Sequence, residues 1–231
     1  MRKQIKLAAL VAATGLVAAS VQAASYNGDL IVGFTSGSGT DFVYDLGSAS
    51  TALVNLNSWD LSSYLGSFNL ATVNWGVIGD STSTHNVWST TDGSYAPRDV
   101  AGHGDLINNI EDPTESIYAN FSTAGAGSSA SISYDPSVPS SSWYSETYSP
   151  SLGNDYANSY NNPNVSGEVS DTIYLMPGYN QDPQVQGYFS LASDGVLTFD
   201  AVPEPSTIGL LTGAGLLLVV LRNKFRRNQL T

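Results

Sequence analysis

Basic residues occur almost only at the two ends of this chain, and this distribution divides it into three parts. Apart from Arg98, every lysine and arginine lies at or before Lys6 or at or after Arg222. All acidic residues except Glu204 lie between Asp29 and Asp200, so the middle part is strongly acidic, and it contains no lysine. An acidic surface of this kind repels phosphate backbones, which excludes nucleic acid as a partner.

The N-terminal segment, residues 1–23, has the three zones of a secretory signal peptide. A basic zone ends at Lys6, and an apolar zone runs from Leu7 to Ala19. A membrane-spanning helix needs about 20 apolar residues, and the apolar zone is shorter than that. Small residues then precede the bond between Ala23 and Ala24, where we expect signal cleavage. The sequence therefore predicts export through the Sec translocon.

The C-terminal segment, residues 202–227, also has three parts. The first is a motif whose two prolines disfavour helix and hold the chain extended: Val202, Pro203, Glu204 and Pro205. The second, residues 206–221, carries no charge and predicts a transmembrane helix, although its apolar run from Ile208 is short for a full span. The third is a basic cluster, expected to stop transfer and stay in the cytoplasm: Arg222, Lys224, Arg226 and Arg227.

This order of motif, apolar helix and basic cluster resembles the PEP-CTERM sorting domain of Gram-negative bacteria. In that family an exosortase, a membrane protease or transpeptidase, recognises the Pro-Glu-Pro motif and cuts there, and the system couples surface export to exopolysaccharide production. The resemblance implies a precursor anchored in the inner membrane and a mature form at the cell surface or outside the cell. It also implies the exosortase and exopolysaccharide as partners. A plain C-terminal membrane anchor is the alternative.

The middle part, residues 24–201, is expected to be one extracytoplasmic β-rich domain. Ser, Thr, Asn and Gly are frequent there and form helices poorly, and the chain has no cysteine. Strand-like runs bounded by turn residues occur at 29–34, 41–47, 52–56, 72–79, 85–90, 171–176, 186–191 and 196–199. We predict an all-β fold, mainly an antiparallel β-sandwich of about eight to ten strands. Short helices are expected at 105–111 and 116–121.

Residues suited to catalysis or metal binding form no familiar motif in this domain. His85 and His103 lack the spacing of a metal site, and no Gly-x-Ser-x-Gly nucleophile turn occurs. Glu111, Asp112 and Glu115 are close in sequence and could offer oxygen ligands to Ca²⁺, but no known calcium-binding loop occurs there and a solvated acidic turn is the favoured interpretation. We therefore predict no enzyme, no cofactor and no metal, with Ca²⁺ as an open alternative.

Aromatic residues leave a second function open. Trp75 lies in a strand pattern and is expected in the core, whereas Trp143 lies in a Ser-rich segment and is the candidate for stacking on a sugar ring. The leading hypothesis is a non-enzymatic surface or matrix protein associated with exopolysaccharide or biofilm. A secreted carbohydrate-binding module is the alternative. A secreted hydrolase comes third and would need a deep pocket with His103 or a carboxylate pair of shifted pKa.

Overall fold

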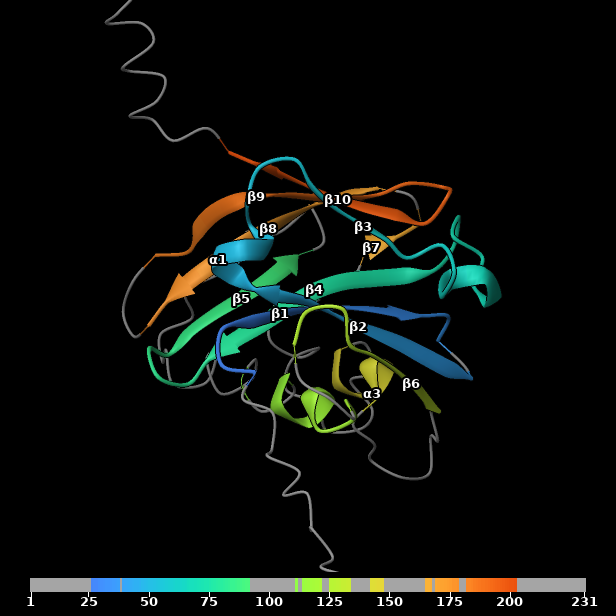
Figure 1. Ribbon diagram of the computed structural model, residues 1–231, viewed down its shortest axis with the longest axis horizontal. Coiled ribbons are helices and arrows are strands. Elements are labelled where there is room, and N and C mark those ends of the chain that lie inside the picture. The colour runs from blue at the N-terminus through green and yellow to red at the C-terminus, as the bar shows by residue number, and fades with distance from the viewer. Residues whose placement is uncertain are drawn as a thin grey trace, which may run out of the picture.

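The described part of the chain is an antiparallel sheet with a few short helices (Figure 1). The computed structural model describes residues 26–37, 39–91, 111, 114–121, 125–133, 142–147, 165–167, 169–178 and 182–202. Its strands are β1 (Asp29–Thr35), β2 (Thr40–Ser48), β3 (Asn57–Asp60), β4 (Asn74–Ser81), β5 (Asn86–Thr91), β6 (Ser129–Ser133), β7 (Val165–Ser166), β8 (Ser170–Pro177), β9 (Gln184–Leu191) and β10 (Val196–Ala201). Its helical elements are α1 (Ala49–Ala52), a 3₁₀ turn (Leu65–Ser67), residues 114–118 and α3 (Trp143–Thr147).

The strands belong to one continuous sheet in the order β3-β10-β9-β8-β5-β4-β1-β2-β6, and β7 pairs with the start of β4. Every neighbouring pair is antiparallel. The sheet curls, so that β8, β9 and β10 lie over β4, β1 and β2 in Figure 1. The predicted all-β antiparallel class is confirmed.

The main core lies between the two halves of the curled sheet. Side chains alternate across a strand, and one face of β1, beginning with Leu30, points into this core. Phe189 of β9 contributes to the same cluster from the other half. Trp75 is fully buried there, and its indole N–H donates to the carbonyl of Gly167 at 2.9 Å. The prediction that Trp75 belongs to the core is confirmed.

A second, smaller core covers the opposite face of β1, β2 and β4. Ile31, Val43 and Ile78 are fully buried on this face. Ile117 and Trp143, from the helical residues 114–118 and from α3, pack on them. The central strands are therefore buried on both faces, which explains why β1 reads as a nearly unbroken apolar run.

The strand predicted at 52–56 is wrong. Ala49–Ala52 form α1, and the chain then turns before β3 begins at Asn57. Leu56 has a φ of 62°, which lies in the left-handed region and cannot belong to a strand.

The helix predictions have two outcomes. The observed helical residues 114–118 overlap the prediction at 116–121 and begin earlier. The helix predicted at 105–111 lies outside the described residues except for Glu111.

Candidate functional site

The predicted processing motif begins where the sheet ends. β10 ends at Ala201, and the next N–H, that of Val202, still donates to the carbonyl of Gln186 at 3.2 Å. Val202 is 38 % exposed. Pro203 follows and has no N–H, so it cannot donate to a further rung of the ladder. The first residue of the motif is thus held at the end of the folded sheet.

The other predicted sorting and processing residues lie outside the described residues: Ala23, Ala24, Pro203, Glu204, Pro205, Arg222, Lys224, Arg226 and Arg227. Arg98, His103 and Asp112 lie outside them as well. Within the described ranges, no helix has the length and apolar character needed to cross a membrane, and the predicted transmembrane segment 206–221 is not among them.

Trp143 is buried, which corrects the prediction that it stacks on a sugar ring. Its side chain has no exposed surface, and its ring lies over the backbone of Gly33 in β1. The Ser-rich sequence around it suggested a surface loop. Instead, the N–H of Tyr144 donates to a carboxylate oxygen of Asp41 at 2.6 Å and holds α3 against β2. A fully buried indole cannot contact a carbohydrate.

Four aspartates lie on the same face of the sheet as the second core, and we call them the carboxylate cluster: Asp29 of β1, Asp41 and Asp45 of β2, and Asp80 of β4. Each aspartate is two residues from a buried aliphatic residue of that face. Side chains two residues apart in a strand point to the same face, so the aspartate and the aliphatic side chain lie on one side of the sheet. Asp41 and Asp45 are fully buried, and Asp80 is 3 % exposed. Sequence reasoning missed this cluster, although the repeated spacing of Asp beside Ile or Val was visible.

Burial raises the pKa of these carboxyl groups because the charged form loses its hydration. Burial, followed by the charge of Asp45, raises the pKa of Asp29 to about 6. Burial, followed by the charges of Glu111 and Glu115, raises the pKa of Asp80 to about 7. Near neutral pH, Asp80 therefore carries a proton for a substantial fraction of the time.

The two aspartates of β2 are tied to backbone N–H groups. Asp45 accepts from the N–H of Gly47 at 2.7 Å, and Asp41 accepts from that of Tyr144. Burial still raises the pKa of both carboxyl groups, and these hydrogen bonds only reduce the effect. One oxygen of each, Oδ1 of Asp41 and Oδ2 of Asp45, is buried without a hydrogen-bond partner. A charged carboxylate is costly there, which favours the protonated form.

Tyrosine rings close the carboxylate cluster on one side. The hydroxyl of Tyr118 donates to the backbone carbonyl of Asp29. The rings of Tyr26 and Tyr118 are stacked with centroids 4.2 Å apart and an angle of 6° between their planes. At the rim, Nδ1 of His85 lies 3.4 Å from Oε1 of Glu111. The cluster is therefore packed into the protein rather than arranged around an open ligand site.

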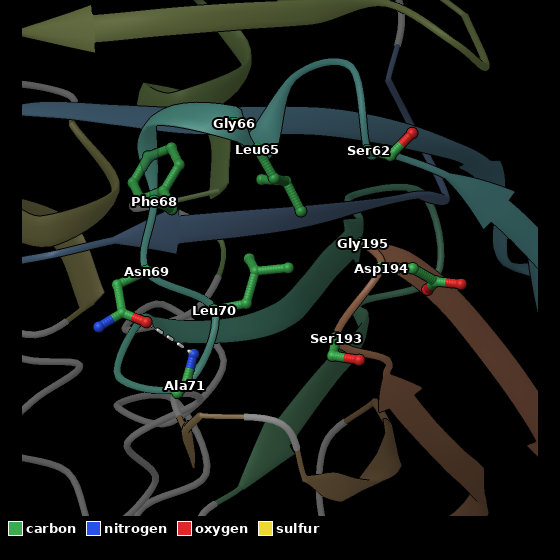
Figure 2. A pocket seen from close by; sticks show the side chains of 10 residues that line it. All are labelled: Ser62, Leu65, Gly66, Phe68, Asn69, Leu70, Ala71, Ser193, Asp194 and Gly195. Carbon is green, nitrogen blue, oxygen red and sulfur yellow. Dashed lines mark hydrogen bonds between the residues drawn. The ribbon is translucent and has the colours of Figure 1, made fainter.

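A surface hollow of about 410 Å³ lies between the segment after β3 and the β9–β10 turn (Figure 2). Its lining consists of small, apolar and amide residues with a single carboxylate: Ser62, Leu65, Gly66, Phe68, Asn69, Leu70, Ala71, Ser193, Asp194 and Gly195. Asn69 accepts from the N–H of Ala71 at 3.2 Å, as Figure 2 shows. None of the carboxylates with a raised pKa lines this hollow, and no histidine does.

Metal binding finds no support within the described ranges, where no three His, Asp or Glu side chains converge as ligands. The predicted Ca²⁺ alternative includes Asp112, which lies outside them, and it stays a prediction. No protein-family model, no curated protein sequence and no solved structure matches this chain.

Proposed function

We propose that this chain is the precursor of an exported surface or extracellular-matrix protein, associated with exopolysaccharide or biofilm. Its sandwich-like β domain lies outside the inner membrane, and an exosortase processes it at Pro203-Glu204-Pro205. The observation that carries the proposal is the join between fold and tail. The last strand ends at Ala201, and the motif, the uncharged segment and the basic cluster follow at once and in that order.

The physical chemistry of the join supports processing there. A protease takes an extended, unpaired segment into its active site, and two prolines favour such a conformation. The hydrogen bond from Val202 to Gln186 fixes the last rung of the sheet immediately before the first of these prolines. The enzyme can therefore bind the motif without unfolding the domain.

The charge distribution supports the topology. Basic residues near a membrane-spanning segment stay in the cytoplasm, and both ends of this chain are basic. The domain between them is acidic and lacks lysine, so nothing in its sequence opposes export.

Within the part of the chain that the structure describes, two features that a hydrolase needs together lie apart, which supports a non-enzymatic role. The carboxyl groups with raised pKa, Asp29 and Asp80, lie beside the stacked tyrosines of the second core. The surface hollow has a different lining, in which Asp194 is the single carboxylate.

Mass spectrometry of the protein from its native host tests the proposal. The protein at the cell surface should lack residues 206–231, and the Pro203→Ala/Pro205→Ala variant should accumulate in the inner membrane with its tail intact. Ser206→Ala, just outside the motif, is the matched control and should be processed normally. An intact chain in the cytosol, or a surface form that keeps Thr231, would overturn the proposal.

A carbohydrate-binding module is the second candidate, and exposed tyrosines favour it. Tyr188 of β9 is 44 % exposed. Burial, followed by the charge of Tyr188, raises the pKa of the Tyr174 hydroxyl in β8, so the two side chains lie close together. Neighbouring aromatic rings on a sheet can stack on sugars. Glycan-array binding that Tyr188→Ser abolishes, and that Tyr64→Ser leaves intact, would support this candidate; no binding to any glycan would contradict it.

A further inference from the structure

Exposed apolar side chains gather where the chain leaves the sheet toward its tail. We call them the exit patch: Val54, Leu56, Val185 and Val202, with exposed fractions of 54, 76, 43 and 38 %. Val54 and Leu56 lie in the loop between α1 and β3, which arches over the sheet beside the end of β10 in Figure 1.

Hydrogen bonds join the segments that carry the exit patch. The N–H of Leu56 donates to the carbonyl of Phe199 at 3.0 Å, and the N–H of Ala201 donates to Oδ1 of Asn55 at 3.1 Å. Val202 bonds to Gln186, which follows Val185 in β9. The loop, the start of β9 and the end of β10 are therefore neighbours, and their apolar side chains share one end of the domain.

Leu56 is an unusual residue for its position. Its φ of 62° is the left-handed conformation, which costs a residue other than glycine about 1–2 kcal/mol. It is also the most exposed of the large apolar side chains in the described part of the chain. Neither the backbone nor contact with water favours leucine here, so its side chain is suited to a contact outside the domain.

Val54, Leu56 and Val185 of the exit patch lie in uncharged sequence, although the domain as a whole is acidic and Asp200 and Glu204 flank Val202. No charged residue occurs from Leu46 to Trp59 or from Pro183 to Ser193. Carboxylates beside a membrane of anionic lipids would be repelled by it, whereas uncharged apolar side chains can enter the headgroup layer. The neutral sequence around Val54, Leu56 and Val185 is thus compatible with a lipid surface.

The length of the connection keeps this end close to the membrane. Five residues, 203–207, separate Val202 from Ile208, where the apolar run of the tail begins. Even fully extended, this stretch reaches about 20 Å. The headgroup layer on one side of a bilayer is itself about 5–8 Å thick. While the tail is in the membrane, the exit end of the domain cannot move far from the lipid.

We propose that the exit patch contacts the lipid headgroup layer while the precursor is anchored, so that the domain stands on the membrane with its sorting motif at the surface. This inference rests on the proposed function, because the inserted tail is what brings the patch to the lipid. Contact at Leu56 and Val54 limits the orientations of the domain and holds Pro203-Glu204-Pro205 at the level at which a membrane protease works.

The absence of cysteine from the chain allows a direct test. Full-length protein carrying Leu56→Cys is labelled with an environment-sensitive fluorophore and reconstituted into phosphatidylcholine vesicles, with and without brominated lipid. Ser193→Cys is the matched control, because Ser193 is exposed in the turn at the opposite end of β10. We expect a blue shift and quenching by brominated lipid at position 56 and neither at position 193.

Flotation of the vesicles separates the two proposals. If the labelled chain floats with the vesicles and the label at position 56 is not quenched, the lipid contact is wrong and the anchoring stands. If labels at both positions are quenched alike, the proposed orientation is wrong. If the chain does not float, anchoring fails and the lipid contact fails with it. Val54→Cys is a second probe of the patch, free of the left-handed backbone, and should behave like Leu56→Cys.

Discussion

The indole ring of Trp143 lies directly over the α-carbon of Gly33, at the place where any other residue would carry its Cβ. This contact joins α3, late in the chain, to the first strand of the sheet, and it closes the second core over β1. Gly33 is needed here for the space that it leaves, since its φ is not in the left-handed region.

Gly33→Ala should therefore destabilise the protein. The added methyl group overlaps the indole ring, so Trp143 or α3 must shift, and overpacking of this kind costs about 1–3 kcal/mol. Urea unfolding followed by near-ultraviolet circular dichroism measures both the loss of stability and the displacement of the tryptophan. Gly66→Ala is the control, because its Cβ would meet no atom within 4 Å and should leave stability nearly unchanged. Equal stability of the two variants would contradict the contact.

Stability should decrease as pH rises from acid to neutral. In the folded protein the pKa of Asp29 is about 6 and that of Asp80 about 7, against an ordinary value of 3.8. A raised carboxyl pKa means tighter proton binding in the folded state, so the contribution of these groups is complete below about pH 3.8 and is lost as pH rises through about 6 and 7. Allowing for solvent access, we expect the free energy of unfolding to fall by about 2–4 kcal/mol between about pH 5 and about pH 8.

Asp80→Asn tests which group is responsible. The amide resembles the protonated carboxyl and does not titrate, so the dependence of the melting temperature on pH should become shallower. Asp194 lies in an exposed turn and is not part of the second core, so Asp194→Asn should keep the full dependence of the melting temperature on pH. A wild-type protein whose melting temperature is constant or rises over this pH range would show that the aspartates are not buried as described.

Leu56→Asn should stabilise the domain slightly. Asparagine tolerates the left-handed conformation better than leucine, and the change removes no buried contact, so we expect a gain of about 0.5–1 kcal/mol. Thermal unfolding measures it. Val54→Asn is the matched control, exposed and in the same loop but outside the left-handed region, and should not stabilise. A loss of stability in Leu56→Asn would mean that the leucine packs within the domain.

Replacing the basic cluster by glutamine should impair the stop of transfer. With Arg222, Lys224, Arg226 and Arg227 neutralised, little opposes passage of the C-terminus through the membrane. A tag placed after Thr231 should then become accessible to protease in spheroplasts, while the tag on the wild-type chain stays protected. Asn223→Ser, within the same segment, should not change protection. Accessibility of the wild-type tag would contradict the proposed topology.

Local patterns allowed much of the fold to be predicted. β1, β2, β4 and β10 were expected from apolar runs bounded by turn residues, and each is present with bounds shifted by a few residues. A strand can be recognised in a sequence because its residues alternate between two faces and turn residues bound its ends. β3 was missed because its four residues carry little pattern of their own and owe their conformation to pairing with β10, far along the chain.

The sequence by itself determined the charge distribution, with an acidic middle part between basic ends, and the hydrophobic runs. These features are local and need no knowledge of neighbours in space. The exported domain and the two processing segments that we infer from them stay predictions. Only the tertiary structure decided that Trp143 is buried on Gly33, that four aspartates share one covered face, and that the loop around Leu56 lies beside the exit of the chain. Each of these depends on which distant strands pair and how the sheet curls, and burial follows from those long-range contacts rather than from the type of residue.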